Sequence, residues 1–309
     1  MEGSSATLAG YGMGGSWNHG RMPESPEVQE LANFLNAHAA GRTIRTVDVL
    51  LPKALKTATP PIGMLVAARV AEVSRIAKML DIAVESPEDG IRHVIVHFGH
   101  DGWVLWHDSA PDDLKRAGEA TLVARLRLSG DVAAGPGFDL TDAGQWKALT
   151  IHLVRTPSDV PAVAKLGPDP TAPGFTEAEF AEIVAGRRKQ IKALLQDQTA
   201  LAGIGNAYSD EILHAAQISP VVHAALLSGE QVSRLYRETR AVLLGATEAR
   251  RGVPPAELRA SKIAALRVHR RTGQTCWRCG GTIHEYSFSG AAAQYCPTCQ
   301  TDGVLLEAG

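Results

Sequence analysis

The stretch Cys276-Trp-Arg-Cys279, followed after sixteen residues by Cys296-Pro-Thr-Cys299, contains all four cysteines of the chain. Two Cys-x2-Cys pairs at this spacing are typical of a zinc ribbon, in which four thiolates bind one tetrahedral ion. A ribbon of this size cannot bury a core of its own, so the metal would hold it folded. A disulfide interpretation is disfavoured because no other feature is typical of a secreted protein. We therefore predict one structural zinc ion.

The composition is that of an ordinary globular protein. The chain has 309 residues, of which 45% are hydrophobic and 21% charged, and this length suggests about two domains. No apolar run approaches the roughly 18 residues of a membrane span. Residues 1–21 are rich in Gly and Ser and lack the apolar centre of a signal peptide, so we interpret them as a disordered extension, a tag or a misassigned start. We expect a cytoplasmic protein with no membrane contact.

The net charge of −2 hides an asymmetry along the chain. Between Arg187 and Arg278 there are 15 Lys and Arg residues against 7 Asp and Glu residues. A basic segment beside a zinc ribbon is what binding to a phosphate backbone requires. A solvated helical surface would have a similar charge, so this feature alone leaves both interpretations open.

The N-terminal half combines one helix with many short strands. Ser25-Pro26-Glu27 is a typical helix start, with Ser as N-cap and Pro in the first turn, and the apolar period continues to about Ala39. Short β-like runs follow, and their density predicts a sandwich or a barrel. These runs are 44–51, 70–73, 79–84, 93–98, 103–106, 121–128 and 149–154.

The C-terminal half is helical and ends in the ribbon. A proline-rich segment, 156–175, is predicted to link it to the β-rich domain, 22–155. Thr176-x-x-Glu179 and Ser228-x-x-Gln231 are capping boxes that predict helix starts. We divide the remainder into a helical domain, 176–265, and a zinc-ribbon hairpin, 266–309. The fold class is therefore α+β.

A glycine-containing turn lies within the helical domain. Gly203-Ile-Gly205-Asn206 precedes a helix, and its backbone N–H groups and the Asn amide could bind a phosphate. A plain turn between two helices explains the same residues equally well. The basic residues just upstream, 187–192, favour a phosphate site.

Several of these motifs together resemble the formamidopyrimidine-DNA glycosylase/endonuclease VIII family. The similarity begins at Met22-Pro23-Glu24-Ser25-Pro26-Glu27-Val28 and continues, in the same order, through Lys192–Gln198, the Gly203–Glu211 segment, Leu266–Gly273 and the four-cysteine ribbon. It covers the chain from Met22 to about Gln300. It implies a two-layer β-sandwich with flanking helices, joined to a helix-two-turn-helix domain with a zinc-ribbon hairpin.

The resemblance also implies an activity and its residues. Family members are bifunctional DNA glycosylases and abasic-site lyases, which excise oxidised bases through a Schiff base on an N-terminal proline, here Pro23. An α-amino group ordinarily has a pKa of about 7.7–8.0, so much more of it than of a lysine amine is neutral at pH 7. Glu24 would transfer protons beside it. The remaining implied residues are Lys78 as a catalytic contact to the phosphate near the lesion, and Asn206, Lys192, Arg271 and His100 in DNA binding.

The chain departs from the family pattern at four places. Pro23 is preceded by 22 residues, and its nitrogen is nucleophilic only if Met22 is the true start. Ala291 stands where the family usually has a zinc-hairpin arginine, and nearby Gln294 is only a neutral substitute. The segment 252–265 is shorter than the loop that caps 8-oxoguanine. His100 replaces a Met or Leu that fills the gap left by the flipped base, although a buried structural histidine fits equally well.

We therefore expect a monomeric base-excision repair enzyme that acts on double-stranded DNA containing oxidised bases or abasic sites, with zinc as its only cofactor. The main alternative is a non-catalytic damaged-DNA-binding protein of the same fold. A zinc-ribbon protein for RNA or protein partners would leave the Pro-Glu start and the Gly-x-Gly-Asn turn unexplained.

Replacing Ala291 with arginine should strengthen DNA binding, because it restores a cation to the hairpin. We expect the Ala291→Arg variant to bind duplex DNA containing an abasic site more tightly, with a steeper salt dependence. Fluorescence anisotropy at several salt concentrations measures both. An unchanged affinity and salt slope would show that the hairpin tip does not contact phosphate.

Overall fold

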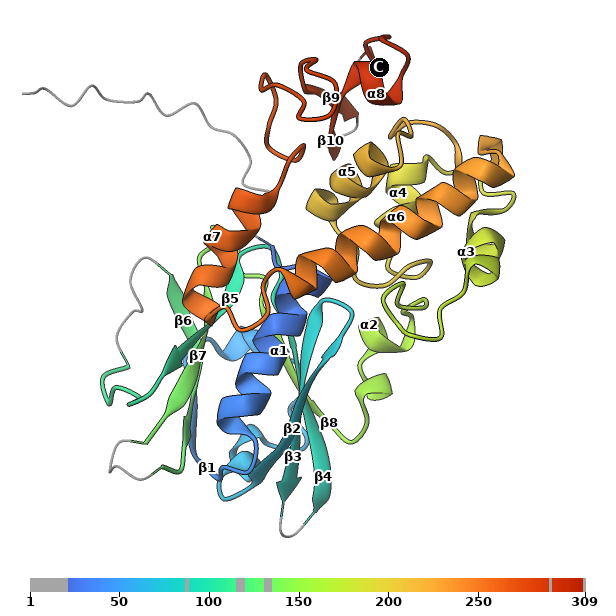
Figure 1. The fold of residues 1–309 in the computed structure, drawn as a ribbon. Helices are drawn as coiled ribbons and strands as arrows, with labels where there is room; N and C mark the ends of the chain where they lie inside the picture. Colours follow the sequence, from blue (N-terminus) through green and yellow to red (C-terminus); the bar gives the residue numbers. More distant parts are fainter. Residues whose placement is uncertain (1–21, 87–88, 115–119, 131–134, 289–290, 308–309) are drawn as a thin grey trace, which may run out of the picture.

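The computed structural model describes residues 22–86, 89–114, 120–130, 135–288 and 291–307 (Figure 1). The predicted extension, 1–21, lies outside the described residues. Within the described part of the chain, no helix is both long and apolar enough to span a bilayer.

The N-terminal half is a sandwich of two antiparallel four-stranded sheets with a common core (Figure 1). Helix α1 (Ser25–Ala39) packs against strand β2. One sheet has the order β1-β6-β7-β5 and the other β2-β3-β4-β8. Their strands are β1 (Ile44–Val49), β2 (Arg69–Ile76), β3 (Met79–Ser86), β4 (Gly90–His97), β5 (Gly102–His107), β6 (Thr121–Leu128), β7 (Gly137–Asp142) and β8 (Thr150–Val154).

The sequence patterns predicted every strand of the sandwich except β7. This strand contains two aspartates, and Asp139 is fully buried in the sheet. Its charge is compensated by Arg125 on β6, whose Nε and Nη2 lie 2.6 and 2.7 Å from the two carboxylate oxygens. The hydrophobic pattern therefore missed β7, because its buried aspartate is paired with an arginine on the neighbouring strand.

The linker segment contains two short helical turns, η3 (Pro157–Asp159) and α2 (Pro161–Ala164). The helical half beyond it has its own apolar core, separate from that of the sandwich. Its helices are α3 (Glu177–Val184), α4 (Ile191–Leu195), α5 (Asn206–Ala215) and α6 (Gly229–Glu248). Both predicted capping boxes are present, at Thr176 and Ser228.

Three further 3-10 turns lie in the connections. Two of them, η1 (Pro52–Ala54) and η2 (Ile62–Leu65), follow β1 in the sandwich, and η4 (Ala224–Leu226) lies between α5 and α6.

Helix α7 (Pro255–Ala265) follows the helical half in sequence but packs on the sandwich (Figure 1). Leu258 is fully buried and belongs to the sandwich core. The indole nitrogen of Trp103 on β5 donates a hydrogen bond to the Pro255 carbonyl at 2.9 Å. The segment 252–265, which we assigned to the helical domain, thus contains a helix that packs on the sandwich at the junction between the two halves.

The chain ends in the predicted ribbon. Strands β9 (His284–Phe288) and β10 (Ala291–Tyr295) form an antiparallel hairpin, and α8 (Pro297–Gln300) follows Cys296. The hairpin lies beside α5, and Gln300 Nε2 donates to the Ile218 carbonyl, just beyond that helix, at 2.9 Å.

Truncating Leu258 should loosen α7 from the sandwich. Leu→Ala changes in fully buried positions cost about 2–5 kcal/mol, so the Leu258→Ala variant should unfold at clearly lower urea concentration. Ile263→Ala on the same helix is the control, because Ile263 is 40% exposed. Equal midpoints for the two variants would contradict the packing of α7 described above.

Candidate active site and zinc centre

Pro23 and Glu24 lie where the two halves of the molecule meet. Both are buried immediately before α1, and the Ser25 N–H donates to the Gly203 carbonyl at 3.1 Å. Glu24, and not Ser25 as predicted, is the N-cap of α1, and its N–H donates to the Glu27 carboxylate at 3.0 Å. The predicted catalytic pair is therefore fixed against the glycine turn of the helical half.

The glycine turn binds the carboxylate of Glu24. The N–H groups of Gly205, Ala207 and Tyr208 donate to its two oxygens at 2.6, 2.9 and 3.3 Å. A Cβ at position 205 would lie 2.5 Å from the Glu24 carboxyl carbon, so only glycine fits there. These N–H groups, for which the sequence left a phosphate site and a plain turn open, hold an anion from the protein itself at the N-terminus of α5.

A second acid and two cations complete this buried cluster. Lys262 of α7 places its ammonium 3.0 Å from Glu27 Oε2 and 3.4 Å from Glu24 Oε1. The Tyr208 hydroxyl donates to Glu27 Oε1 at 2.6 Å, and Arg250 Nε lies 3.7 Å from the same oxygen. All five side chains are almost completely buried, so each charge depends on its neighbours.

Lys262 was not among the site residues predicted from the sequence. The available signal was its position four residues after Leu258, which places a cation on the buried face of a helix. A hydrophobic pattern with one lysine is not specific enough to assign that residue a partner 238 positions earlier.

The cluster determines the protonation state of Glu24. Burial alone would raise its pKa, but the ammonium groups of Lys262 and Lys78 and the Ala207 N–H outweigh burial and hold the pKa below its ordinary value. Glu24 is therefore a carboxylate at neutral pH.

Lys78 occupies the two-residue turn between β2 and β3 and contributes to the electrostatics at Glu24. Burial lowers the pKa of Lys78; Glu24 opposes this effect and Lys262 adds to it. Lys78 is half-buried in this turn. His100 is exposed in the turn after β4, so the alternative of a buried structural histidine is wrong.

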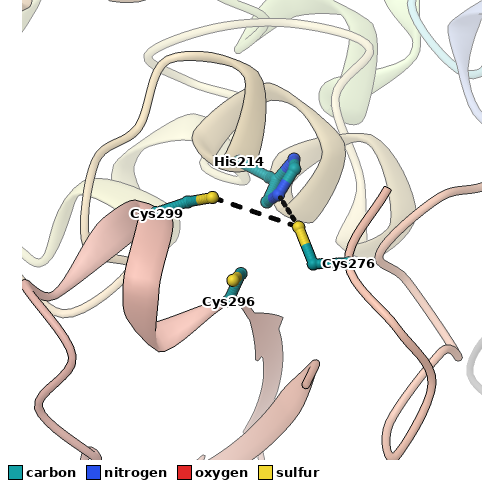
Figure 2. A group of neighbouring side chains, drawn as sticks. All are labelled: His214, Cys276, Cys296 and Cys299. Carbon is teal, nitrogen blue, oxygen red and sulfur yellow. Dashed lines mark hydrogen bonds between the residues drawn. The ribbon is translucent and has the colours of Figure 1, made fainter. Parts of the chain in front are cut away.

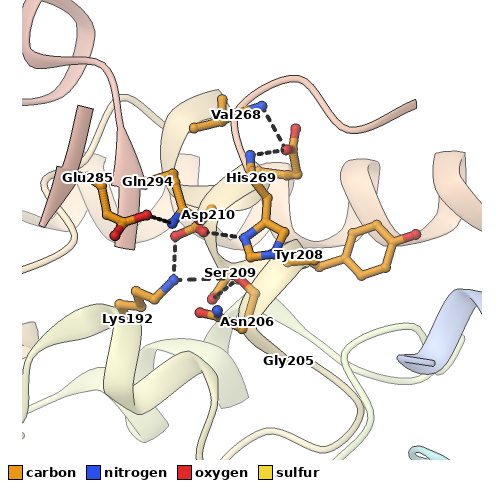
Figure 3. Close-up of polar contacts among 12 residues, drawn as sticks. Lys192, Gly205, Asn206, Tyr208, Ser209, Asp210, Val268, His269, Glu285 and Gln294 are labelled. Atoms are coloured by element: carbon orange, nitrogen blue, oxygen red, sulfur yellow. Dashed lines mark hydrogen bonds and ion pairs between the residues drawn. The ribbon is translucent and has the colours of Figure 1, made fainter. Parts of the chain in front are cut away.

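Asn206 begins α5, and its neighbours support the start of this helix (Figure 3). Its Oδ1 accepts a hydrogen bond from Gln196 Nε2 at 3.1 Å, which orients the amide. Lys192, predicted to bind DNA, is 6% exposed and forms a buried ion pair with Asp210, so it supports the turn and is not free for a direct phosphate contact. His269 Nδ1 lies 2.7 Å from the other Asp210 oxygen.

Two further residues singled out in the sequence have protein partners. The guanidinium of Arg271 donates to the carbonyl groups of Leu266 and Ile263 at 3.0 and 3.2 Å, and so caps the end of α7. Gln294 is buried and donates to Glu285 across the hairpin at 2.7 Å (Figure 3). Gln294 therefore does not replace the missing hairpin arginine, because it is buried and its amide nitrogen already donates to Glu285 within the ribbon.

The four cysteines converge at the base of the ribbon, and Figure 2 shows three of them. The Sγ atoms of Cys279 and Cys296 are 3.4 Å apart, and those of Cys276 and Cys299 are 4.0 Å apart. A tetrahedron with metal–sulfur bonds of about 2.3 Å has edges of about 3.8 Å, so the four thiolates fit one zinc ion. The residues around them include buried Val268 and Ile283.

His214 of α5 is a neighbour of this centre that the sequence did not predict (Figure 2). Its Nε2 lies 3.2 Å from Cys276 Sγ, and it forms a close cluster with Cys276, Cys296 and Cys299. Burial, together with Arg278 and Arg267, lowers the pKa of His214 to about 4, so the imidazole is neutral. A neutral imidazole can donate an N–H to the thiolate, and this contact joins the ribbon to α5.

Zinc analysis of single variants distinguishes the cysteine ligands from their neighbour. We expect one zinc per chain in the parent protein and in His214→Phe, and loss of the metal in Cys299→Ser, measured by atomic emission after dialysis. Loss of zinc from His214→Phe as well would assign the histidine to the ligand set.

The sequence of the chain matches known protein families. Three family models match: the formamidopyrimidine-DNA glycosylase N-terminal domain at residues 22–132, its H2TH domain at 166–254, and the zinc finger found in FPG and IleRS at 273–301. The zinc finger match and the clustered thiolates confirm the predicted structural zinc site.

Named relatives and a solved structure agree with these matches. A formamidopyrimidine-DNA glycosylase of Symbiobacterium thermophilum is 32% identical over 92% of both chains. A formamidopyrimidine-DNA glycosylase-like protein of Mycobacterium tuberculosis, described as uncharacterized, is 46% identical over 47% of this chain and 91% of its own length. The Lactococcus lactis Fpg in complex with abasic-site DNA has a TM-score of 0.76 and 26% identity, covering 90% of this chain and 99% of its own. The chain therefore belongs to the formamidopyrimidine-DNA glycosylase family.

Proposed function

We propose that this protein is a base-excision repair DNA glycosylase with abasic-site lyase activity, and that the Pro23 nitrogen is its nucleophile once Met22 is removed. The observation that carries this proposal is the placement of Pro23 beside an ionised, rigidly held carboxylate. Glu24 is fixed by three backbone N–H groups and one ammonium at the junction of the two halves. This is the arrangement that nucleophilic catalysis by an amine needs.

The chemistry would proceed at C1′ of a nucleotide rotated out of the duplex. The lone pair of Pro23 bonds to C1′, and the C1′–N bond breaks with its electron pair leaving on the base, which takes up a proton. Because Glu24 starts ionised, it accepts the proton that the Pro23 nitrogen loses and then donates it to O4′ as the sugar ring opens. The resulting iminium acidifies C2′, whose deprotonation expels the 3′ phosphate.

The surrounding residues support binding of a DNA strand across the junction. We assign Lys78 and Asn206 to phosphate contacts on either side of Glu24, since one lies in the β2–β3 turn and the other at the start of α5. His100 is exposed in the turn after β4 and would fill the gap left by the rotated base. We propose a monomer that acts on double-stranded DNA at the nucleoid.

Helix α7 bears on the choice of lesion. It occupies the segment in which guanine-lesion members carry a longer capping loop, and it is fastened to the sandwich through Leu258 and Pro255. We therefore propose oxidised pyrimidines, ring-opened purines or abasic sites as substrates in preference to 8-oxoguanine.

One observation favours the alternative of a damaged-DNA-binding protein without catalysis. In the full chain the Pro23 nitrogen is part of an amide, and the Met22 carbonyl accepts a hydrogen bond from Lys262 at 3.1 Å. An amide nitrogen has no basic lone pair, so a chain that retains residue 22 would bind DNA without forming a Schiff base.

Borohydride trapping on abasic-site DNA tests the proposed nucleophile. The Pro23 amine condenses with the C1′ aldehyde and releases water, and hydride reduces the iminium to a stable covalent adduct. We expect an adduct from protein expressed from Met22 and shown by mass to begin at Pro23, and none from the full chain. Glu24→Gln should slow trapping by about 10²-fold or more. Measurable DNA binding without any adduct from the processed form would leave only the binding protein.

A further inference from the structure

Lys262 is a buried cation that the proposed chemistry has not yet used. It is 2% exposed and lies on the face of α7 that points into the junction between the two halves. Its ammonium has three oxygen neighbours, at Glu27, Glu24 and the Met22 carbonyl, and lies 5.1 Å from the centre of the Tyr208 ring. Apolar packing alone does not explain a lysine with these neighbours.

The contact with Met22 places this charge next to the candidate nucleophile. The carbonyl oxygen 3.1 Å from Lys262 Nζ belongs to the peptide bond that includes the Pro23 nitrogen. Given the C=O and C–N bond lengths, the ammonium lies within about 5.5 Å of that nitrogen. A like charge at this distance disfavours protonation of an amine.

Other charged groups face the same space from every neighbouring element. Glu24 and Glu27 approach from α1, Lys78 from the β2–β3 turn, Arg250 from the end of α6 and His269 from the segment after α7, while Tyr208 of α5 is held as a neutral phenol beside Glu27. Each carboxylate is thus matched by a cation. The loss of Lys262 removes one positive charge and leaves both carboxylates less compensated, and both effects favour protonation of a nearby amine.

We propose that the Lys262 ammonium keeps the Pro23 amine neutral, and therefore nucleophilic, at neutral pH, and at the same time holds Glu24 ready to accept a proton. This inference rests on the proposed function, because it concerns the amine that exists only after Met22 is removed. Lys262 acts as a positioning residue and forms no bond to the substrate.

Lys262 is better suited than Lys78 to keep the Pro23 amine neutral. Burial would lower the pKa of Lys262, but Glu27 and Glu24 outweigh it and raise the pKa, so its charge is permanent. Lys78 has a lowered pKa and lies on a turn that we assign to DNA contact. A fixed charge on a packed helix gives the same field whether or not DNA is bound.

The direct test is the titration of the Pro23 amine. Protein labelled with ¹⁵N-proline and processed to begin at Pro23 gives an amine resonance whose shift follows protonation. The family match and the described residues both begin at residue 22, so this form keeps every described residue except Met22. We expect Lys262→Met to raise the amine pKa by about one unit or more, and Lys262→Arg to leave it near the parent value. The exposed Lys165→Met is the matched control.

We expect the same variants to differ in the pH profile of borohydride trapping. Only the neutral amine attacks, so the trapping rate decreases as the pH falls below the pKa of the amine. Lys262→Met should therefore move this decrease to higher pH. Lys262→Arg should restore the parent profile. A merely structural role would lower the rate equally at all pH values and would leave both profiles and the ¹⁵N titration unshifted, which would overturn the inference.

A second comparison covers the case in which Lys262→Met does not fold. In the double variant Glu27→Gln/Lys262→Met, only the Glu24 carboxylate loses its contact with Lys262, so this variant is less destabilised. The amine pKa should still be higher in the double variant than in Glu27→Gln alone. The NMR titration needs no DNA. If the parent protein forms no adduct but the amine pKa shifts as expected, the proposed function fails and the assignment of Lys262 stands; an unshifted pKa removes the assignment alone.

Discussion

The contact between the Glu24 carboxylate and the N-terminus of α5 is the constraint on which the rest of the site depends. It joins the first residues of the sandwich to a turn about 180 positions later, through N–H groups of Gly205 and Ala207. The helix dipole and three donors stabilise the ionised form against the cost of burial. Because the same carboxylate begins α1, the orientation of both helices and the location of Pro23 are set by one anion.

Helix α7 completes this arrangement from a third direction. The buried carboxylates of Glu24 and Glu27 need compensating cations, and Lys262 and Arg250 supply them from the last third of the chain. The two halves are therefore joined by charge compensation as well as by apolar packing. A buried network of this kind adds specificity more reliably than stability, since each charge tolerates only one arrangement of its partners.

The sequence predicted the architecture well because most of its signals were local. The cysteine spacing, the capping boxes at Thr176 and Ser228 and the alternating strands each depend on a few neighbouring residues. The exceptions involve partners that are distant in sequence. Strand β7 was missed because Asp139 is neutralised by a residue on another strand, and Lys262 and His214 acquire their roles only through residues from elsewhere in the fold. For the glycine turn the sequence left a phosphate site and a plain turn open, and in the structure its N–H groups bind the Glu24 carboxylate.

Helix α5 connects the two predicted centres. Its first turn holds Glu24 and presents Asn206, its middle pairs Asp210 with Lys192 and His269, and His214 near its end reaches the zinc thiolate of Cys276. A ribbon without metal would lose the partner of His214 and, through the segment that carries His269, disturb the support of Asp210. A zinc ion bound by the four cysteines would therefore also stabilise the orientation of the helix whose N-terminus holds the candidate catalytic carboxylate.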